Sequence, residues 1–131
     1  MPSKRSRVAM TEAEVEELLA SAAKVQVATV GRDGAPHLST LFHVLDAGRI
    51  AFWTYGTSQK VRNLERDPRI TCLVETGTDY FELAGVSLQG TAEIVRNEER
   101  VRTIGSAVVR KMAGPDPAPD EVPARVVRRR G

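Results

Sequence analysis

The chain has 131 residues, of which 41% are hydrophobic and 27% charged, and these proportions fit one folded domain over residues 1–131 rather than a disordered protein. No stretch approaches the roughly 20 apolar residues that cross a bilayer, and the basic residues 1–10 lack a following signal-peptide core. We therefore predict a cytoplasmic protein with a flexible N-terminus and no membrane partner.

Charge and cysteine content bear on two further properties, nucleic-acid binding and disulfide formation. The formal net charge is only +2, and much of the positive excess lies in a basic tail. This tail follows a Pro-rich loop, and the loop and tail together span residues 115–131. Without a basic face, such a tail does not predict nucleic-acid binding. The one cysteine, Cys72, lies in an apolar run, so we expect a buried side chain and no intrachain disulfide.

The first predicted element is a helix over residues 11–23. Thr11 and Glu14 have the spacing of a capping box, which satisfies free backbone N–H groups at a helix start. Apolar residues then recur at helical spacing, at Val15, Leu18, Leu19 and Ala22.

Two β-rich runs, residues 25–30 and 37–45, follow on either side of a Gly-rich turn and predict a hairpin. Alternation along the second run separates two faces, one with Leu38, Thr40, Phe42 and Val44 and the other with His37, Ser39, Leu41 and His43. We expect the first of these faces to enter the core.

Turn-punctuated elements continue to the end of the chain. They are strands over 50–55 and 70–75, a strand pair or one bent strand within 80–95, and helices capped by Ser58 and Asn97, the second of them ended by Gly114. Short strands with helices at the start, middle and end are typical of a mainly β protein, a β-barrel with peripheral helices.

The most informative local feature is the segment 56–60, which runs from a strand end into a helix start. Free backbone N–H groups and the helix dipole attract phosphate there, and the Ser58 hydroxyl and Lys60 amine can add hydrogen bonds. A lysine in a first helical turn otherwise costs about 0.3 to 1 kcal/mol. The alternative is that Ser58 is only an N-cap and Lys60 part of a solvated face.

The sequence contains no pattern typical of a metal site or of paired catalytic carboxylates. His37 and His43 stand about 20 Å apart on a straight strand, so they cannot share a metal, and we expect each to be an interfacial or surface side chain. Acidic residues at 67, 79, 82 and 93 show no paired spacing. Trp53 and Tyr55 can border a ring system or fill a dimer seam.

Six motifs, at residues 27–30, 33–37, 52–55, 58–60, 62–64 and 67–69, together resemble the pyridoxamine 5'-phosphate oxidase-like superfamily, the FMN-binding split barrels. The likeness covers roughly residues 11 to 96. Within it, residues 60–64 followed by 67–69 look most like the branch that binds the deazaflavin coenzyme F420.

The resemblance implies a homodimeric split β-barrel with a cofactor in a groove between protomers. The segment matching residues 54–60 would hold the cofactor phosphate, and the strand that starts at His37 would pass along its ring. The candidate cofactor-binding residues are therefore His37, Leu38, Ser39, Thr40, Trp53, Tyr55, Thr54, Thr57, Ser58, Gln59 and Lys60, with no metal.

This sequence departs from the FMN oxidase branch at three cations. That branch carries an Arg and a Lys on the strand matching residues 37–44 and an Arg where Gln59 stands. Without these three cations, the dianionic phosphate of FMN would lack charged hydrogen-bond partners. We therefore predict an F420-dependent reductase that transfers hydride to a small organic substrate; the alternatives are an FMN-binding pyridoxamine phosphate oxidase-like protein and a non-catalytic F420 or flavin carrier.

Overall fold

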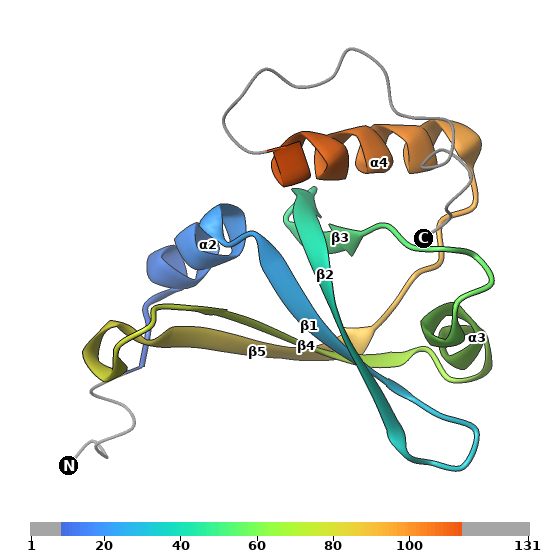
Figure 1. Cartoon of the computed structure of the whole chain (residues 1–131), viewed down its shortest axis with the longest axis horizontal. Helices are drawn as coiled ribbons and strands as arrows, with labels where there is room; N and C mark the ends of the chain where they lie inside the picture. Colours follow the sequence, from blue (N-terminus) through green and yellow to red (C-terminus); the bar gives the residue numbers. More distant parts are fainter. Residues whose placement is uncertain (1–8, 114–131) are drawn as a thin grey trace.

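The computed structural model describes residues 9–113 and consists of one curled antiparallel sheet with helices around it (Figure 1). The sheet order is β3-β2-β1-β4-β5. The strands are β1 (Lys24–Val30), β2 (Pro36–Asp46), β3 (Arg49–Phe52), β4 (Arg69–Thr76) and β5 (Ala84–Thr91), and the helices are α2 (Glu12–Ser21), α3 (Gln59–Arg66), α4 (Glu98–Ala113) and the short 3-10 helix η1 (Tyr80–Glu82). The predicted mainly β class is confirmed.

Some predictions lie outside the described residues. Residues 1–8 hold most of the predicted flexible N-terminus, and residues 114–131 hold the predicted helix end at Gly114, the Pro-rich loop and the basic tail. No described helix is both long and apolar enough to cross a membrane.

The main core lies where α2 covers the inner face of the sheet. Val25 and Val27 of β1 are fully buried, as is Val74 of β4, and Leu18 of α2 packs against them. The predicted capping box starts α2, because the Glu14 N–H donates to Thr11 Oγ1 and the Thr11 N–H donates to the Glu14 carboxylate. Cys72 belongs to the same core cluster, as its apolar surroundings predicted.

The predicted core face of β2 is wrong over its first half. Leu41 and Ser39 pair with the buried Val25 and Val27, and directly paired residues of an antiparallel sheet lie on the same face. Leu38, which was expected inside, is 67% exposed. Further along the same outer face, Phe42 and Val44 pack against α4 instead of the main core.

Two other boundaries differ from the prediction. The third strand ends at Phe52 rather than at residue 55, because the chain leaves the sheet at Trp53 to cross toward α3. Between residues 80 and 95, where a strand pair or one bent strand was predicted, there is the single strand β5, and it starts only at Ala84, after η1.

A second apolar cluster joins α4 to β2 and β3. Trp53, Val101 and Val108 form it, with Phe42 and Ile104 around them. Gly105 of α4 lies against the indole, since a Cβ placed there would meet ring atoms at 3.0 to 3.3 Å. The predicted cap of this helix is confirmed by the Arg100 N–H, which donates to Asn97 Oδ1 at 3.1 Å.

His43 is buried inside the protomer, which corrects the expectation of a surface or interfacial side chain. It is 0% exposed, and its Nε2 lies 2.9 Å from the carbonyl oxygen of Leu19. Because a carbonyl only accepts, this nitrogen carries the proton. Burial lowers the pKa of His43, and the nearby Lys111 ammonium lowers it further, against the Leu19 hydrogen bond.

We expect this histidine to make the protein less stable in mild acid. Unfolded His43 takes up a proton near its ordinary pKa of 6.5, whereas folded His43, whose pKa is lowered, takes one up only at lower pH. The unfolded state therefore binds more protons, and stability falls as the pH drops below 6.5. The loss reaches at most about 1.4 kcal/mol per pH unit. Denaturation curves at about pH 7 and 5 measure it, and an equal loss in His43→Gln would contradict the assignment.

Candidate functional site

The candidate site is the turn that leads from β3 into α3. Thr54 is buried at 4% exposure, and the chain then turns so that the Ser58 N–H donates to the Tyr55 carbonyl at 3.0 Å. Ser58 caps α3, its hydroxyl accepting from the Val61 N–H at 3.4 Å. Residues 56–60 therefore lead into a helix start capped by Ser58, as the sequence predicted, and the structure adds a buried hydroxyl, that of Thr54, next to the first turn.

Lys60 is the charged group at this turn. Its Nζ donates to Thr54 Oγ1 at 3.2 Å, and within the described residues it makes no ion pair. Burial lowers the pKa of Lys60, and α3 has no acidic residue in its first turn. A partly buried ammonium with no anion beside it, at the positive end of a helix, is the arrangement that a bound anion would stabilise.

A buried amide anchors this helix to the sheet. Asn63 is 0% exposed, and its Nδ2 donates to Thr29 Oγ1 of β1 at 3.1 Å. Its Oδ1 accepts from Gln59 Nε2 at 2.8 Å and from Arg66 at 3.1 Å, while Arg66 also donates to the Val30 carbonyl at 2.7 Å. Because arginine only donates, the orientation of the Asn63 amide is fixed.

The structure brings some of the predicted site residues together and separates others. Thr54, Ser58, Gln59 and Lys60 lie at one turn, and Thr57 and Tyr55 are exposed beside them. By contrast, the four candidates of β2 alternate between the two faces of the sheet. His37 and Ser39 face inward and Leu38 and Thr40 outward, so their side chains cannot all meet one ligand.

The inward pair of β2 carries polar atoms that lack a partner. His37 Nδ1 and Ser39 Oγ are both shielded from solvent, and neither has a hydrogen-bond partner among the described residues. Thr29 pairs with His37 across the β1–β2 ladder and bonds to Asn63 of α3. The inward side chains of β2 are therefore one strand away from the anchor of α3.

Trp53 fills the interior instead of lying open at the site. It is 8% exposed and packs against α4 through Gly105. Tyr55, two residues later, is 47% exposed at the turn. The two aromatic residues, predicted as a pair, thus lie in different surroundings, and only Tyr55 is open to a ligand in the protomer.

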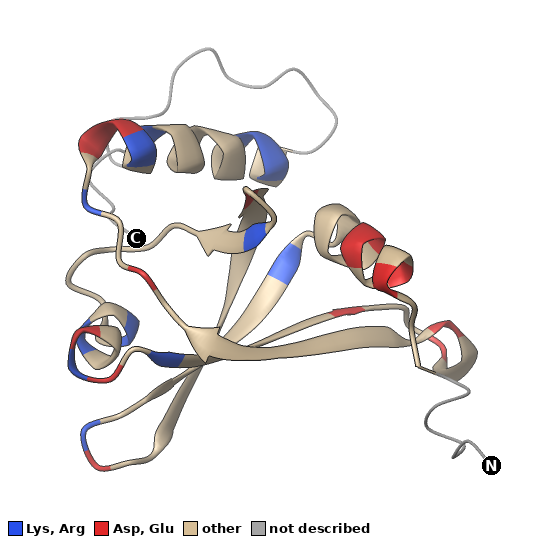
Figure 2. Cartoon of the chain, turned by 180° about the vertical axis from the view of Figure 1, so that it is seen from behind, with Lys and Arg blue, Asp and Glu red and all other residues tan. Residues whose placement is uncertain are grey.

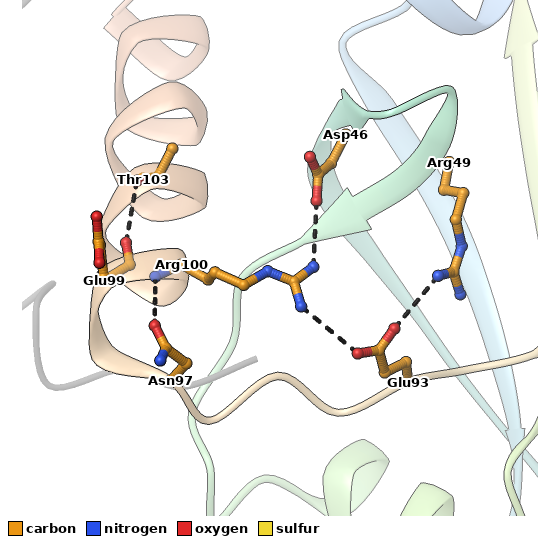
Figure 3. A network of polar contacts seen from close by, with 7 residues as sticks. All are labelled: Asp46, Arg49, Glu93, Asn97, Glu99, Arg100 and Thr103. Atoms are coloured by element: carbon orange, nitrogen blue, oxygen red, sulfur yellow. Dashed lines mark hydrogen bonds and ion pairs between the residues drawn. The ribbon is translucent and has the colours of Figure 1, made fainter.

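Sequence reasoning missed a pocket and the polar network at its edge. The pocket has a volume of about 380 Å3 and is partly open to solvent, with Phe52, Leu88 and Ile104 among its lining residues. Figure 3 shows that Arg100 bonds to Asp46 and Glu93, and that Glu93 also pairs with Arg49. These partners are up to 54 residues apart, so no local signal could have found them.

The charge distribution also favours an anion at α3. Figure 2 shows acidic residues along α2, whereas α3, toward the other end of the sheet, carries both basic and acidic residues. Helix α2 contains four glutamates, and α3 contains Lys60, Arg62 and Arg66 with one glutamate. A field of this kind steers an anionic ligand toward the α3 end. No group of metal-ligating side chains occurs within residues 9–113.

Comparison with known proteins decides the family. Residues 11–129 match the family described as Pyridoxamine 5'-phosphate oxidase. The chain belongs to this family. The predicted resemblance to the pyridoxamine 5'-phosphate oxidase-like superfamily and the predicted split β-barrel are therefore both confirmed. Among curated proteins no sequence matches the chain.

Solved structures show the same split barrel. A conserved hypothetical protein from Mycobacterium tuberculosis is 36% identical, with a TM-score of 0.83 over 98% of this chain and 81% of that one. An F420 reductase is 23% identical, with a TM-score of 0.65 over 87% and 86% of the two chains. A FAD-binding protein from Mesorhizobium loti is 14% identical, with a TM-score of 0.67 over 84% and 81%. The last two likenesses establish the fold alone.

Proposed function

We propose that this member of the pyridoxamine 5'-phosphate oxidase family is an F420-dependent reductase. The observation that carries the proposal is Lys60, a partly buried amine at the start of α3 whose hydrogen bond goes to a neutral hydroxyl and not to an acid. Its charge is available for a cofactor phosphate, together with the backbone N–H groups of the first helical turn. A protein of the same fold is an F420 reductase, so the fold can accommodate a deazaflavin.

In this proposal the coenzyme supplies the chemistry and the protein supplies the geometry. When bound, reduced deazaflavin would supply the hydride for an unsaturated or oxidised small molecule, and water would supply the accompanying proton, so the chain would need no acid/base pair of its own. Lys60 and Ser58 hold the phosphate, Thr54 positions the Lys60 amine, and Tyr55 and Thr57 lie open beside the turn. The backbone of β2 runs alongside the ring.

The proposal includes a homodimer with the cofactor between protomers. Leu38 and Thr40 on the outer face of β2 are exposed in the protomer, Leu38 at 67%. A partner protomer and a cofactor ring laid on this face would cover that apolar surface, which a monomer would leave in contact with water. Sedimentation of the purified protein should therefore give the mass of two chains.

A titration with two coenzymes tests the proposed function. Oxidised F420 and FMN are added separately to the protein, and coenzyme fluorescence gives each Kd. We expect F420 to bind at least about tenfold more tightly, because one lysine matches its single phosphate charge better than the two charges of FMN. Reduced F420 bound to the protein should then be reoxidised by members of a panel of unsaturated and oxidised small molecules.

Each rival function has its own outcome in the same experiment. Tighter binding of FMN would favour an FMN-binding oxidase-like protein. Tight binding of F420 without reoxidation by any compound of the panel would favour a non-catalytic carrier. If neither coenzyme bound, the proposed function would be wrong and only the fold would stand.

A further inference from the structure

Two exposed aromatic residues lie at the turn between β4 and β5. Tyr80 and Phe81 of η1, which we call the aromatic tip, are 80% and 97% exposed, and their rings meet edge to face with centroids 5.3 Å apart. The turn has a tightly packed backbone, because Gly77 adopts a φ of 96° and a Cβ there would collide with the Glu82 carbonyl. Adjacent aromatic side chains presented to water in this way are typical of a surface that contacts another molecule.

The aromatic tip and α3 carry opposite charge at the two ends of β4. Residues 75–82 contain three acidic residues and no basic one, whereas residues 59–69 contain four basic residues and two acidic ones. Strand β4 has eight residues, which at about 3.3 Å per residue separate its ends by about 26 Å. Within one protomer the tip and α3 therefore lie at opposite ends of the sheet (Figure 1) and cannot meet.

An uncharged surface joins these two ends on the outer face of the sheet. Two ladders of paired residues cross four strands there, and directly paired residues share a face. All eight side chains are exposed or half-buried, and none is charged. They are Leu38, Ala28, Thr71 and Gln89 in one ladder and Thr40, Gln26, Leu73 and Ser87 in the other. Because no charge has to leave water, this surface can pack against a second copy of itself.

Charge decides how two such surfaces are oriented. The limiting directions of a twofold axis in the plane of the surface are along the strands and across them. An axis along the strands would bring the acidic segments 75–82 of both chains together, where like charges repel. An axis across the strands reverses one sheet relative to the other, so that each acidic segment meets the basic α3 end of its partner.

We propose that the aromatic tip of each protomer covers the α3 turn of the other, so that each cofactor site is completed by the partner subunit's Tyr80 and Phe81. The inference rests on the homodimer of the proposed function and not on the identity of the cofactor. Two identical contacts form in each dimer, as twofold symmetry requires. A bound ring at the turn would then have an aromatic side chain of the second chain available for stacking.

Crosslinking without coenzyme tests this contact. Phe81→Cys and Thr57→Cys chains, purified separately with tags of different mass, are mixed and treated with a short bis-maleimide. Both positions are exposed, and wild-type protein is the blank because its Cys72 is buried. We expect the mixed pair as the main covalent product. Glu16→Cys, at an exposed position of α2, is the control and should give little product with Phe81→Cys.

Replacing Phe81 with serine measures what the tip contributes. The dissociation constant of the dimer should rise at least about tenfold, because two aromatic anchors are lost per dimer. The protomer fold should be unchanged, since this ring is exposed. When the variant is concentrated enough to be dimeric, its coenzyme binding should be about two- to tenfold weaker. Met112→Ser, at an exposed apolar position of α4, should change neither quantity.

The outcomes separate the inference from the proposed function. Crosslinking of Phe81→Cys mainly to itself, or equally to Glu16→Cys, would overturn the inference and leave the homodimer in place. Unchanged coenzyme affinity in dimeric Phe81→Ser would remove the tip from the cofactor site. If F420 and FMN both failed to bind while Phe81→Cys and Thr57→Cys crosslinked, the proposed function would be wrong and the arrangement of the dimer would stand.

Discussion

Replacing Lys60 with alanine is expected to weaken F420 binding by about 10- to 100-fold. Hydrogen bonds to charged groups contribute about 1.5 to 3 kcal/mol, and each 1.4 kcal/mol is a factor of ten in Kd. The fold should survive, because in the free protein Lys60 bonds only to the Thr54 hydroxyl and makes no ion pair within the described residues. Fluorescence titration with F420 measures the loss.

The pH dependence of F420 binding provides a second test of the role of Lys60. Burial lowers the pKa of Lys60 below its ordinary value of 10.5, so its positive charge is present at lower pH and is lost as the pH rises through that lowered pKa. F420 affinity should fall along with it, and the Lys60→Ala protein should lack this decline.

Arg62→Ala is the matched control for this experiment. It removes a cation from the same helix, but from an exposed position on another side, and should change Kd by less than about twofold, as expected for a screened surface charge. Equal losses in the two variants would mean that general attraction, and not a bound phosphate at Lys60, explains the affinity.

Replacing Trp53 with alanine is expected to cost about 3 to 5 kcal/mol of stability, the range found for large aromatic side chains removed from cores. The indole is 8% exposed and lies between β3 and α4, against Gly105 and the buried Val101 and Val108. Because Gly105 has no side chain to move into the space, the cavity cannot close from the helix side. Urea denaturation followed by circular dichroism measures the free energy of unfolding.

Two further variants separate the structural role of Trp53 from a role in the cofactor site. Trp53→Phe keeps much of the apolar volume and should leave F420 binding within about twofold. Met112→Ala removes a side chain that is 56% exposed at the far end of α4 and should change stability by no more than about 0.5 kcal/mol. Loss of F420 binding in Trp53→Phe with full stability would instead place the indole against the cofactor ring.

Local patterns were sufficient for most elements of this fold. The capping box of α2, the Ser58 cap of α3 and the Asn97 cap of α4 are each short-range hydrogen-bond arrangements, and the residues involved specify them almost alone. Alternation also placed β1 and β2 in a hairpin. The turn carrying Lys60 could be predicted for the same reason, because a strand end, a cap and a basic residue are adjacent in sequence.

The failures all required information from distant parts of the chain. Alternation shows which residues of β2 share a face but not which face is buried. Pairing with the buried Val25 and Val27 of β1 places the more polar face of β2 inward. The burial of His43 depends on the Leu19 carbonyl, 24 residues away. The anchoring of α3 depends on the bond between Asn63 and Thr29, two residues that lie 34 positions apart in the sequence.

The position of the single tryptophan gives the protein a built-in optical reporter. Trp53 adjoins Thr54, whose hydroxyl contacts Lys60, while its ring is packed under α4. A flavin or deazaflavin absorbs light where tryptophan emits, so a coenzyme held at this turn would quench the indole by resonance energy transfer without shifting its spectrum. Release of α4 would instead shift the emission to the red. One unlabelled sample can therefore distinguish occupancy of the site from opening of the core.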